Sequence, residues 1–254
     1  MRGELCIGTA SLLTLVAVLL LVFVHIGQIS TASTPRSISM AQVNVSGYGD
    51  ALYAAFSDPI LGLYTNNASA PLNARAGLRQ LYKFGLYSHC AYVNQTAGLC
   101  TNTTAAYQFR PYTVITSDML SNYSGYTDAI IHNATFADSS SLGGNSRSAY
   151  YLLLLGSILA TISLATGVIK HTWAFFISTL SATMASIFVL AGSALWTVLI
   201  KRAKDINTWT VRPAQVPLGI EVSTGVALYL TWAAFACLAT SIIPYMISCC
   251  TFRG

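Results

Sequence analysis

The sequence predicts an all-α membrane protein, a four-transmembrane-helix bundle with a large disulfide-stapled loop domain between the first and second helices. Three observations support this prediction. Only 8% of the 254 residues are charged, whereas a soluble globular domain carries about 25%. Four long apolar stretches contain no Asp, Glu, Lys or Arg. Every N-glycosylation sequon falls in the loop between the first two of them.

Each apolar stretch is long enough to cross a membrane. A helix needs about 20 residues to span the ~30 Å hydrocarbon core, and the stretches contain no Asp, Glu, Lys or Arg and a single histidine, His25. The rest of the chain is too short to bury four such helices in a soluble core, so we expect four spans. The stretches are Leu5–Ile26, Ala149–Ile169, Thr172–Ile200 and Val222–Phe252.

The spans divide the chain into five segments. The first span could instead be a cleaved secretory signal, because Arg2 precedes it and small residues follow it, but its apolar run exceeds the usual length of about 7–15 residues. We therefore expect a retained helix. The segments are 1–27 (N-terminus and first helix), 28–148 (loop domain), 149–200 (second and third helices with a short turn), 201–222 (second loop) and 223–254 (fourth helix and short tail).

The sequons indicate which side of the membrane the long loop occupies. N-glycans are added to Asn-x-Ser/Thr on secreted surfaces, so six sequons confined to one loop predict that this loop is extracellular. Both termini, and the turn between the second and third helices, then face the cytosol. The candidate glycosylation sites are Asn44, Asn67, Asn94, Asn102, Asn122 and Asn133.

Two of the six cysteines lie in this loop and predict one disulfide. Cys90 and Cys100 are ten positions apart, in a compartment that we expect to be oxidising. Closing a loop of that size stabilises a fold by about 2–3 kcal/mol in the chain-entropy model. A tetrahedral zinc site is not expected, because only His89 accompanies the two cysteines.

The charge distribution favours the opposite orientation. The positive-inside rule places short basic loops in the cytosol, yet the short second loop contains Lys201, Arg202, Lys204 and Arg212. We give more weight to the sequons and the cysteine pair, because both require passage through the secretory lumen.

Residues of the long loop resemble a known signature. Gly85, Leu86, Tyr87 and Cys90, followed by Cys100, are similar to the G-L-W-x-x-C…C motif of the claudin-like four-span superfamily. Tyrosine in place of the tryptophan is similar to the fungal branch, the PalI/Sur-seven family. The loop lacks the further tryptophan that claudins proper carry, so the resemblance does not extend to a paracellular pore.

The resemblance implies a non-enzymatic protein of the fungal plasma membrane. Members of the Sur-seven branch mark stable cortical (eisosome-associated) membrane domains and affect cell-wall organisation, whereas members of the PalI branch assist a membrane pH sensor. The resemblance also implies a small antiparallel β-sheet in the loop domain. Segments 81–87 and 107–116 are compatible with strands, although Pro111 would place the second at an edge or interrupt it. An irregular loop held by the disulfide is the alternative.

Three further cysteines are candidates for S-palmitoylation, because they lie at the predicted cytosolic ends of the first and fourth helices. Free thiols are the alternative. The three are Cys6, Cys249 and Cys250.

Small residues recur at four-residue spacing in the third and fourth helices. Such spacing lets helices approach closely, either within the bundle or between copies of the chain. The residues are Ser178, Ala182 and Ser186 in the third helix, and Ala233, Cys237 and Ser241 in the fourth.

Catalysis finds no support in the sequence. The four histidines are scattered and no phosphate-binding or dinucleotide motif is present, so we expect no catalytic residue, metal, cofactor or nucleic-acid partner. The favoured hypothesis is a plasma-membrane scaffold that organises cortical domains and supports cell-wall integrity. Its expected partners are membrane lipids, sterol or sphingolipid among them, and further copies of the chain. The alternative is an accessory subunit of a larger membrane protein: a pH-sensing receptor, a channel or a cell-wall synthase.

Overall fold

A computed structural model of the chain describes residues 2–57, 60–131, 134–169, 172–211 and 215–251. The chain divides into two compact units. We call them the helical unit and the sheet unit after their main elements. The helical unit comprises 1–25, 148–195 and 227–254, and the sheet unit comprises 26–147 and 196–226.

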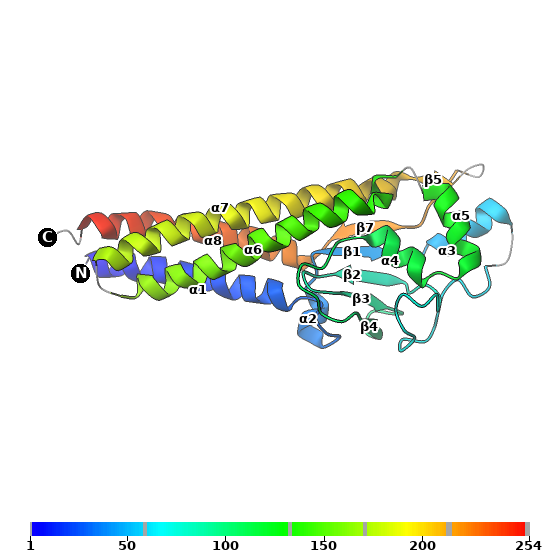
Figure 1. Cartoon of the computed structure of the whole chain (residues 1–254), viewed down its shortest axis with the longest axis horizontal. Helices are drawn as coiled ribbons and strands as arrows, with labels where there is room; N and C mark the ends of the chain where they lie inside the picture. The colour runs from blue at the N-terminus through cyan, green and yellow to red at the C-terminus, as the bar shows by residue number, and fades with distance from the viewer. Residues whose placement is uncertain (1, 58–59, 132–133, 170–171, 212–214, 252–254) are drawn as a thin grey trace. The chain divides into compact units, whose positions relative to one another are not determined.

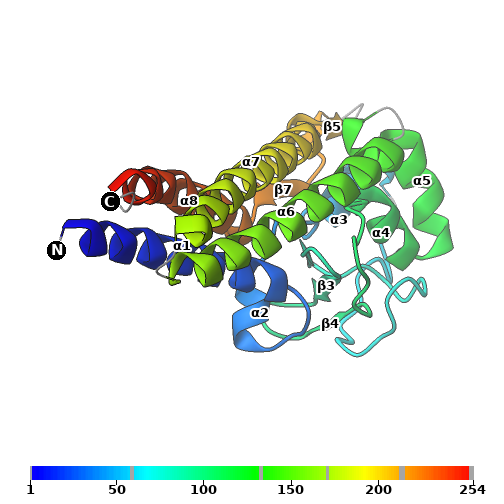
Figure 2. The ribbon, with the colours of Figure 1, turned by 60° about the vertical axis from the view of Figure 1, so that its left-hand side comes forward.

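Four of the described helices are long and apolar enough to span a membrane, which confirms the predicted bundle. They run side by side, and α1 begins at the end of the bundle where α8 ends (Figure 1, Figure 2). An even number of spans requires this arrangement. The four helices are α1 (Arg2–Ile26), α6 (Ser139–Gly167), α7 (Thr172–Ala203) and α8 (Val226–Thr251).

Two of these helices are longer than the sequence predicted. With 29 residues in α6 and 32 in α7, at 1.5 Å per residue, they are about 43 and 48 Å long and exceed the ~30 Å hydrocarbon core. α6 begins at Ser139, before the predicted start at 149, because Asp138 caps it: its Oδ1 accepts a hydrogen bond from the Ser141 N–H at 3.0 Å. The first turns of α6 and the last turns of α7 belong to the sheet unit.

Small residues let the helices of the helical unit pack closely. Ser178, Ala182 and Ser186 of α7 are buried. The Ser178 hydroxyl donates to the Ser163 carbonyl oxygen of α6 at 2.8 Å, and the Ser163 hydroxyl donates to the Ser178 carbonyl oxygen at 3.0 Å. The small residues of α7 therefore serve packing within the chain, whereas Ala233 of α8 is exposed.

Tyr245 connects all four helices of this unit. It forms a buried cluster with Ala10 of α1 and Ala182 of α7, and its hydroxyl accepts a hydrogen bond from Thr14 at 3.4 Å. A Cβ on Gly167 of α6 would lie 2.6 Å from the same hydroxyl. The absence of a side chain at Gly167 therefore makes room for the Tyr245 ring.

A five-stranded antiparallel sheet forms the centre of the sheet unit and confirms the sheet that the resemblance implied. Val43 pairs with Tyr82 on one side and with Val222 on the other, so buried side chains of three strands share one face. The strand order is β4-β3-β2-β1-β7. The strands are β1 (Ala41–Asn44), β2 (Leu81–Phe84), β3 (His89–Tyr92), β4 (Gly98–Cys100) and β7 (Glu221–Thr224).

The remaining elements of the sheet unit are short. The predicted strand over 107–116 is wrong: Pro111 begins helix α4, because a proline suits the first helical position, where no N–H is needed. The elements are α2 (Ser33–Ser37), α3 (Tyr48–Phe56), α4 (Pro111–Asp118), α5 (Ser121–Ile131), the 3₁₀ helices η1 (Thr135–Ala137) and η2 (Lys204–Thr208), and the paired strands β5 (Thr210–Val211) and β6 (Val216–Pro217).

Strand β7 lies across the boundary between the second loop and the predicted fourth helix, where the sequence analysis placed no strand; the fourth helix begins at Val226 and not at 223. It pairs with β1 in a register that runs from Ala41 opposite Thr224 to Asn44 opposite Glu221. The side-chain amide of Asn207 accepts a hydrogen bond from the Val222 N–H at 2.8 Å and donates one to the Val222 carbonyl oxygen at 3.0 Å. Asn207 therefore occupies backbone groups of this edge strand that an additional strand would need.

Candidate functional site

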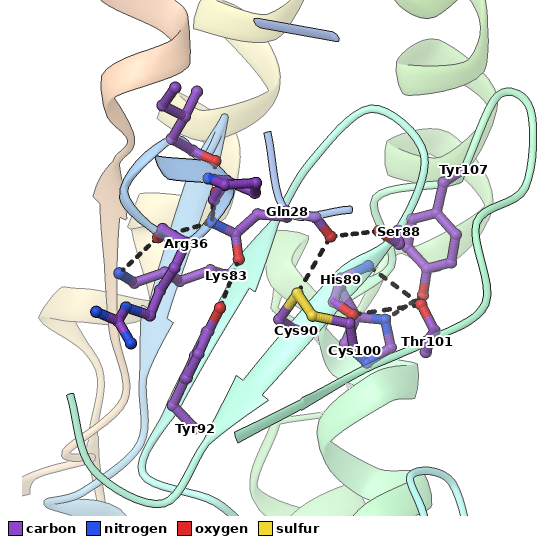
Figure 3. Close-up of a disulfide and its surroundings, with 12 residues drawn as sticks. Gln28, Arg36, Lys83, Ser88, His89, Cys90, Tyr92, Cys100, Thr101 and Tyr107 are labelled. Atoms are coloured by element: carbon purple, nitrogen blue, oxygen red, sulfur yellow. Dashed lines mark hydrogen bonds between the residues drawn. A yellow bond between two sulfur atoms is a disulfide. The ribbon is translucent and has the colours of Figure 1, made fainter. Parts of the chain in front are cut away.

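The signature residues lie on neighbouring strands β3 and β4 of the sheet unit and on the loop between β2 and β3, and Figure 3 shows two of them, Cys90 and Cys100. Gly85, Leu86 and Tyr87 form the loop between β2 and β3, and the Gly85 N–H closes this loop by donating to the Ser88 carbonyl oxygen at 2.9 Å. Leu86 is buried. The motif is thus the connection of a β-hairpin, and the cysteine that follows it lies on β3.

The predicted disulfide is confirmed. Cys90 of β3 and Cys100 of β4 lie directly opposite each other, with Cα atoms 3.9 Å apart. Their neighbours carry the strand pairing, since the Thr101 N–H donates to the His89 carbonyl oxygen at 3.0 Å. The disulfide therefore attaches a three-residue edge strand to the sheet, where few backbone hydrogen bonds hold it.

Gln28, two positions after the end of α1, is the central polar residue of the site and was not predicted. It is fully buried and has a positive φ of 59°. Its backbone N–H donates to the Pro35 carbonyl oxygen at 3.0 Å. Its side-chain Nε2 lies 2.9 Å from each of three carbonyl oxygens, those of Pro35, Arg36 and Ile38. Gln28 thus holds the segment around α2 in a closed turn.

The acceptor groups of Gln28 face the signature (Figure 3). Its carbonyl oxygen accepts a hydrogen bond from the Ser88 hydroxyl at 2.5 Å and lies 3.1 Å from Cys90 Sγ, which has no proton in the disulfide, so this is a contact only. Its Oε1 accepts a hydrogen bond from the Tyr92 hydroxyl at 3.1 Å. Burial raises the pKa of Tyr92 to about 12, so this hydroxyl remains a donor at neutral pH.

Gly85 packs against Gly27 and Gln28. A Cβ at this position would lie 2.5 Å from the Gly27 carbonyl oxygen and 3.0 Å from the Gln28 Cβ. Backbone cannot give way as a flexible side chain can, so only glycine fits. This contact explains why the signature begins with glycine.

We expect Gly85→Ala to lower the free energy of unfolding by about 1–3 kcal/mol, because the added methyl overpacks a backbone contact. The measurement is the thermal midpoint of the full chain in detergent. Gly125→Ala is the matched control, since a Cβ there meets nothing within 4 Å and alanine favours its helix. Equal midpoints for the two variants would contradict the proposed role of Gly85.

His89 is buried beside the disulfide. Its Nδ1 lies 2.5 Å from the Tyr107 hydroxyl, while its Nε2 has no hydrogen-bond partner in the described part of the chain. Its ring stacks on Phe84 with centroids 5.6 Å apart. Burial, with a smaller contribution from the charge of Arg79, lowers the pKa of His89 to about 4. The imidazole is therefore neutral in the folded protein at physiological pH.

His89 makes the sheet unit sensitive to acid. Its pKa is about 4 in the fold and 6.5 in the unfolded chain, so its contribution to stability is complete above pH 6.5 and is lost as the pH falls to about 4. The difference is worth about 3 kcal/mol at 1.36 kcal/mol per pH unit. Asp118 acts in the opposite direction, because burial raises the pKa of its carboxyl.

We expect the thermal midpoint of the wild type to fall more steeply between pH 7 and about 4.5 than that of His89→Asn, whose amide can still bond Tyr107. The comparison at each pH removes the contribution of Asp118, which both proteins share. Parallel curves for the two proteins would show that His89 does not carry this dependence.

An ion pair is buried in the same unit. Arg79 Nη1 lies 3.5 Å from Asp118 Oδ2, and both side chains are almost fully buried. Asp118 also accepts hydrogen bonds from the Tyr82 hydroxyl at 2.9 Å and from the Asn73 N–H at 2.6 Å, and Arg79 Nη2 donates to the Ala70 carbonyl oxygen. The pair connects the chain before β2 to the end of α4.

The remaining predicted sites are dispersed. Among the described residues, no three His, Cys, Asp or Glu side chains come together to hold a metal ion. The side chains of Cys6, Cys249 and Cys250 and the whole of Asn133 lie outside the described residues. The other five sequon asparagines are exposed, one of them inside helix α5: Asn44, Asn67, Asn94, Asn102 and Asn122. Glycosylation and palmitoylation at these positions stay predictions.

The comparison with protein families gives one match. The profile of the SUR7/PalI family matches residues 6–244, which include most of α1 and α8, the whole of α6 and α7, the signature and strand β7. No curated protein matches the chain.

Proposed function

Because the chain belongs to the SUR7/PalI family, we propose that it is a non-enzymatic scaffold of the plasma membrane, which organises cortical, eisosome-like domains and supports the integrity of the cell wall. One observation supports this proposal best. Gly85, Ser88 and Cys90 contact the chain's own Gly27 and Gln28. The signature residues therefore make contacts within the chain that stabilise the fold of the sheet unit. A domain stiffened in this way is suited to hold a fixed surface toward neighbouring molecules.

The scaffold has its sheet unit outside the cell and its termini in the cytosol. The six sequons and the disulfide support this orientation, since both chemistries belong to the secretory lumen. Acylation of Cys6, Cys249 and Cys250 would add cytosolic anchors and favour ordered lipid, with sterol or sphingolipid as the partner.

Lipid contact follows from the outer face of the helices. Large apolar side chains of α1 are exposed, which in a bilayer places them against acyl chains. These are Leu12, Leu15, Leu19, Val22 and Phe23.

The test is the distribution of the full chain, tagged at its C-terminus, in living cells. We expect stable patches at the cell cortex, and reduced resistance to wall stress after deletion. A diffuse signal together with unchanged wall-stress resistance would overturn the scaffold.

An accessory subunit of a larger membrane protein is the second candidate, with a pH-sensing receptor, a channel or a cell-wall synthase as the partner. It is favoured by a small-residue face of α8 that remains exposed, at Ala233, Ala236 and Thr240, since such a face lets another helix approach closely. Purification in mild detergent distinguishes the two. A single large partner in fixed proportion favours the subunit, and a series of self-sized complexes favours the scaffold.

A further inference from the structure

A cavity of about 380 Å³ lies in the sheet unit where the long loop between the first and second spans (the first loop) meets the second loop. It is open to solvent on one side and has room for several ordered waters, or for a sugar ring in their place. The first loop contributes Asn44, Ser46 and Gly47. The second loop contributes Asn207, Pro217, Gly219, Ile220 and Glu221.

Two glycines form the closest approach of the loops in this cavity. A Cβ on Gly47 would lie 3.1 Å from the Gly219 Cα, and a Cβ on Gly219 would collide with the Gly47 carbonyl group. Gly219 also has a positive φ of 73°. The two backbones therefore cross in direct contact beside the β1–β7 ladder, with no side chain between them.

Asn44 is both a sequon asparagine and a wall of this cavity. Its Oδ1 accepts a hydrogen bond from the Ser46 N–H at 3.0 Å, while its Nδ2, the atom that carries an N-glycan, makes no hydrogen bond in the described part of the chain. Asn44 lies opposite Glu221 in the β1–β7 ladder, so the two side chains share a face of the sheet.

We propose that the first N-acetylglucosamine of a glycan on Asn44 sits in this cavity and fastens the two loops together. The attachment forms a bond between Asn44 Nδ2 and C1 of the sugar. It breaks the bond between C1 and the diphosphate of a polyprenyl-linked donor, and the amide proton is lost to solvent. The inference rests on the proposed orientation, which brings the loops into the glycosylating lumen.

The lining suits this sugar. Pro217 is exposed and offers apolar surface to the face of the ring, and the Glu221 carboxylate is a charged acceptor for its hydroxyl and amide protons. Asn207 lies at the same cavity with its amide already bonded to Val222. A sugar held by Asn44 on β1 and by Glu221 on β7 would join the two strands at their ends.

The test compares two sequons of the same local geometry in the full chain, produced with high-mannose glycans. Asn67 also has Ser at the third position and also accepts a hydrogen bond from that serine's N–H at 3.0 Å, but it does not line this cavity. Ser46→Ala and Ser69→Ala each abolish one sequon and keep the asparagine and its hydrogen bond.

We expect Ser46→Ala to lower the thermal midpoint by about 2–4 °C and Ser69→Ala to leave it unchanged. Trimming the wild-type glycans enzymatically to a single N-acetylglucosamine should leave the midpoint unchanged, because only the first sugar sits in the cavity. Glu221→Gln should lower the midpoint in the glycosylated protein and not in protein made without glycans.

Mass spectrometry of the glycopeptides distinguishes failure of this inference from failure of the proposed orientation. If other sequons are occupied and Asn44 is bare, or if Ser46→Ala and Ser69→Ala behave alike, the inference is overturned and the orientation stands. If no sequon is occupied, the proposed orientation fails and the inference fails with it.

Discussion

Replacing Arg79 by methionine is expected to lower the free energy of unfolding by about 3–5 kcal/mol, because it leaves the buried carboxylate of Asp118 without its counter-charge. Arg79 and Asp118 lie 3.5 Å apart with their side chains almost fully out of water. A buried charge without a partner is costly, whereas a buried pair replaced as a whole costs little. The expected result is therefore a large effect of the single substitution and a smaller effect of the double one.

The double variant Arg79→Met with Asp118→Asn tests this reasoning. The asparagine keeps an acceptor for the Asn73 N–H and a polar partner for the Tyr82 hydroxyl, but carries no charge. We expect it to recover more than half of the lost stability, measured as the denaturation midpoint of the full chain in detergent. If the double variant is as unstable as Arg79→Met, the effect comes from lost packing of the arginine.

Cys90→Ser and Cys100→Ser are expected to cost about 2–4 kcal/mol each and to retain the protein in the secretory pathway. The disulfide holds β4, an edge strand of three residues, so its loss frees both the strand and the loop that follows it. The measurement is the fraction of tagged protein at the cell surface.

Two comparisons complete this experiment. Cys237→Ser is the matched control, because Cys237 is a free, half-buried cysteine of α8, and it should reach the surface normally. The double variant Cys90→Ser with Cys100→Ser should be no worse than either single one, since each removes the same bond. Normal surface delivery of both single variants would refute a stabilising role for the disulfide.

The four spans and the disulfide were predictable because their signals do not depend on the fold. A run of apolar residues the length of Thr172–Ile200 has few alternatives to crossing a membrane. Cys90 and Cys100 were the only cysteines in the long loop, which left one pairing there. Composition was sufficient to predict the spans, and the expected oxidising compartment was sufficient to predict the disulfide.

The short strands were harder to predict. β1 and β7 each have four residues, and Gln42 between Ala41 and Val43 is too brief an alternation to separate a strand from a loop. In segment 107–116 the aromatic and β-branched residues suggested a strand, but helix α4 begins there at Pro111. The position of this proline in that segment was the available signal: it left an edge strand and an interrupted strand open, and the structure shows the interruption.

The polar centre of the site could not be predicted from local sequence. Gln28 reaches Tyr92, 64 positions away, and Arg79 reaches Asp118, 39 positions away. Neither residue lies in a motif, and a single glutamine after an apolar helix is unremarkable in composition. Only the closing of the sheet brings these partners together, so their roles depend on contacts that a single sequence does not reveal.

The pairing of β1 with β7 has a consequence for how the protein is made. The ribosome finishes β1 long before it reaches Thr224, the partner of Ala41, and two membrane-spanning helices must be inserted in between. At roughly 5–20 residues per second, this delay is on the order of 10–40 s. Throughout that time the edge of β1 lacks its neighbour, and any chain terminated before residue 221 leaves the translocon without its closing strand.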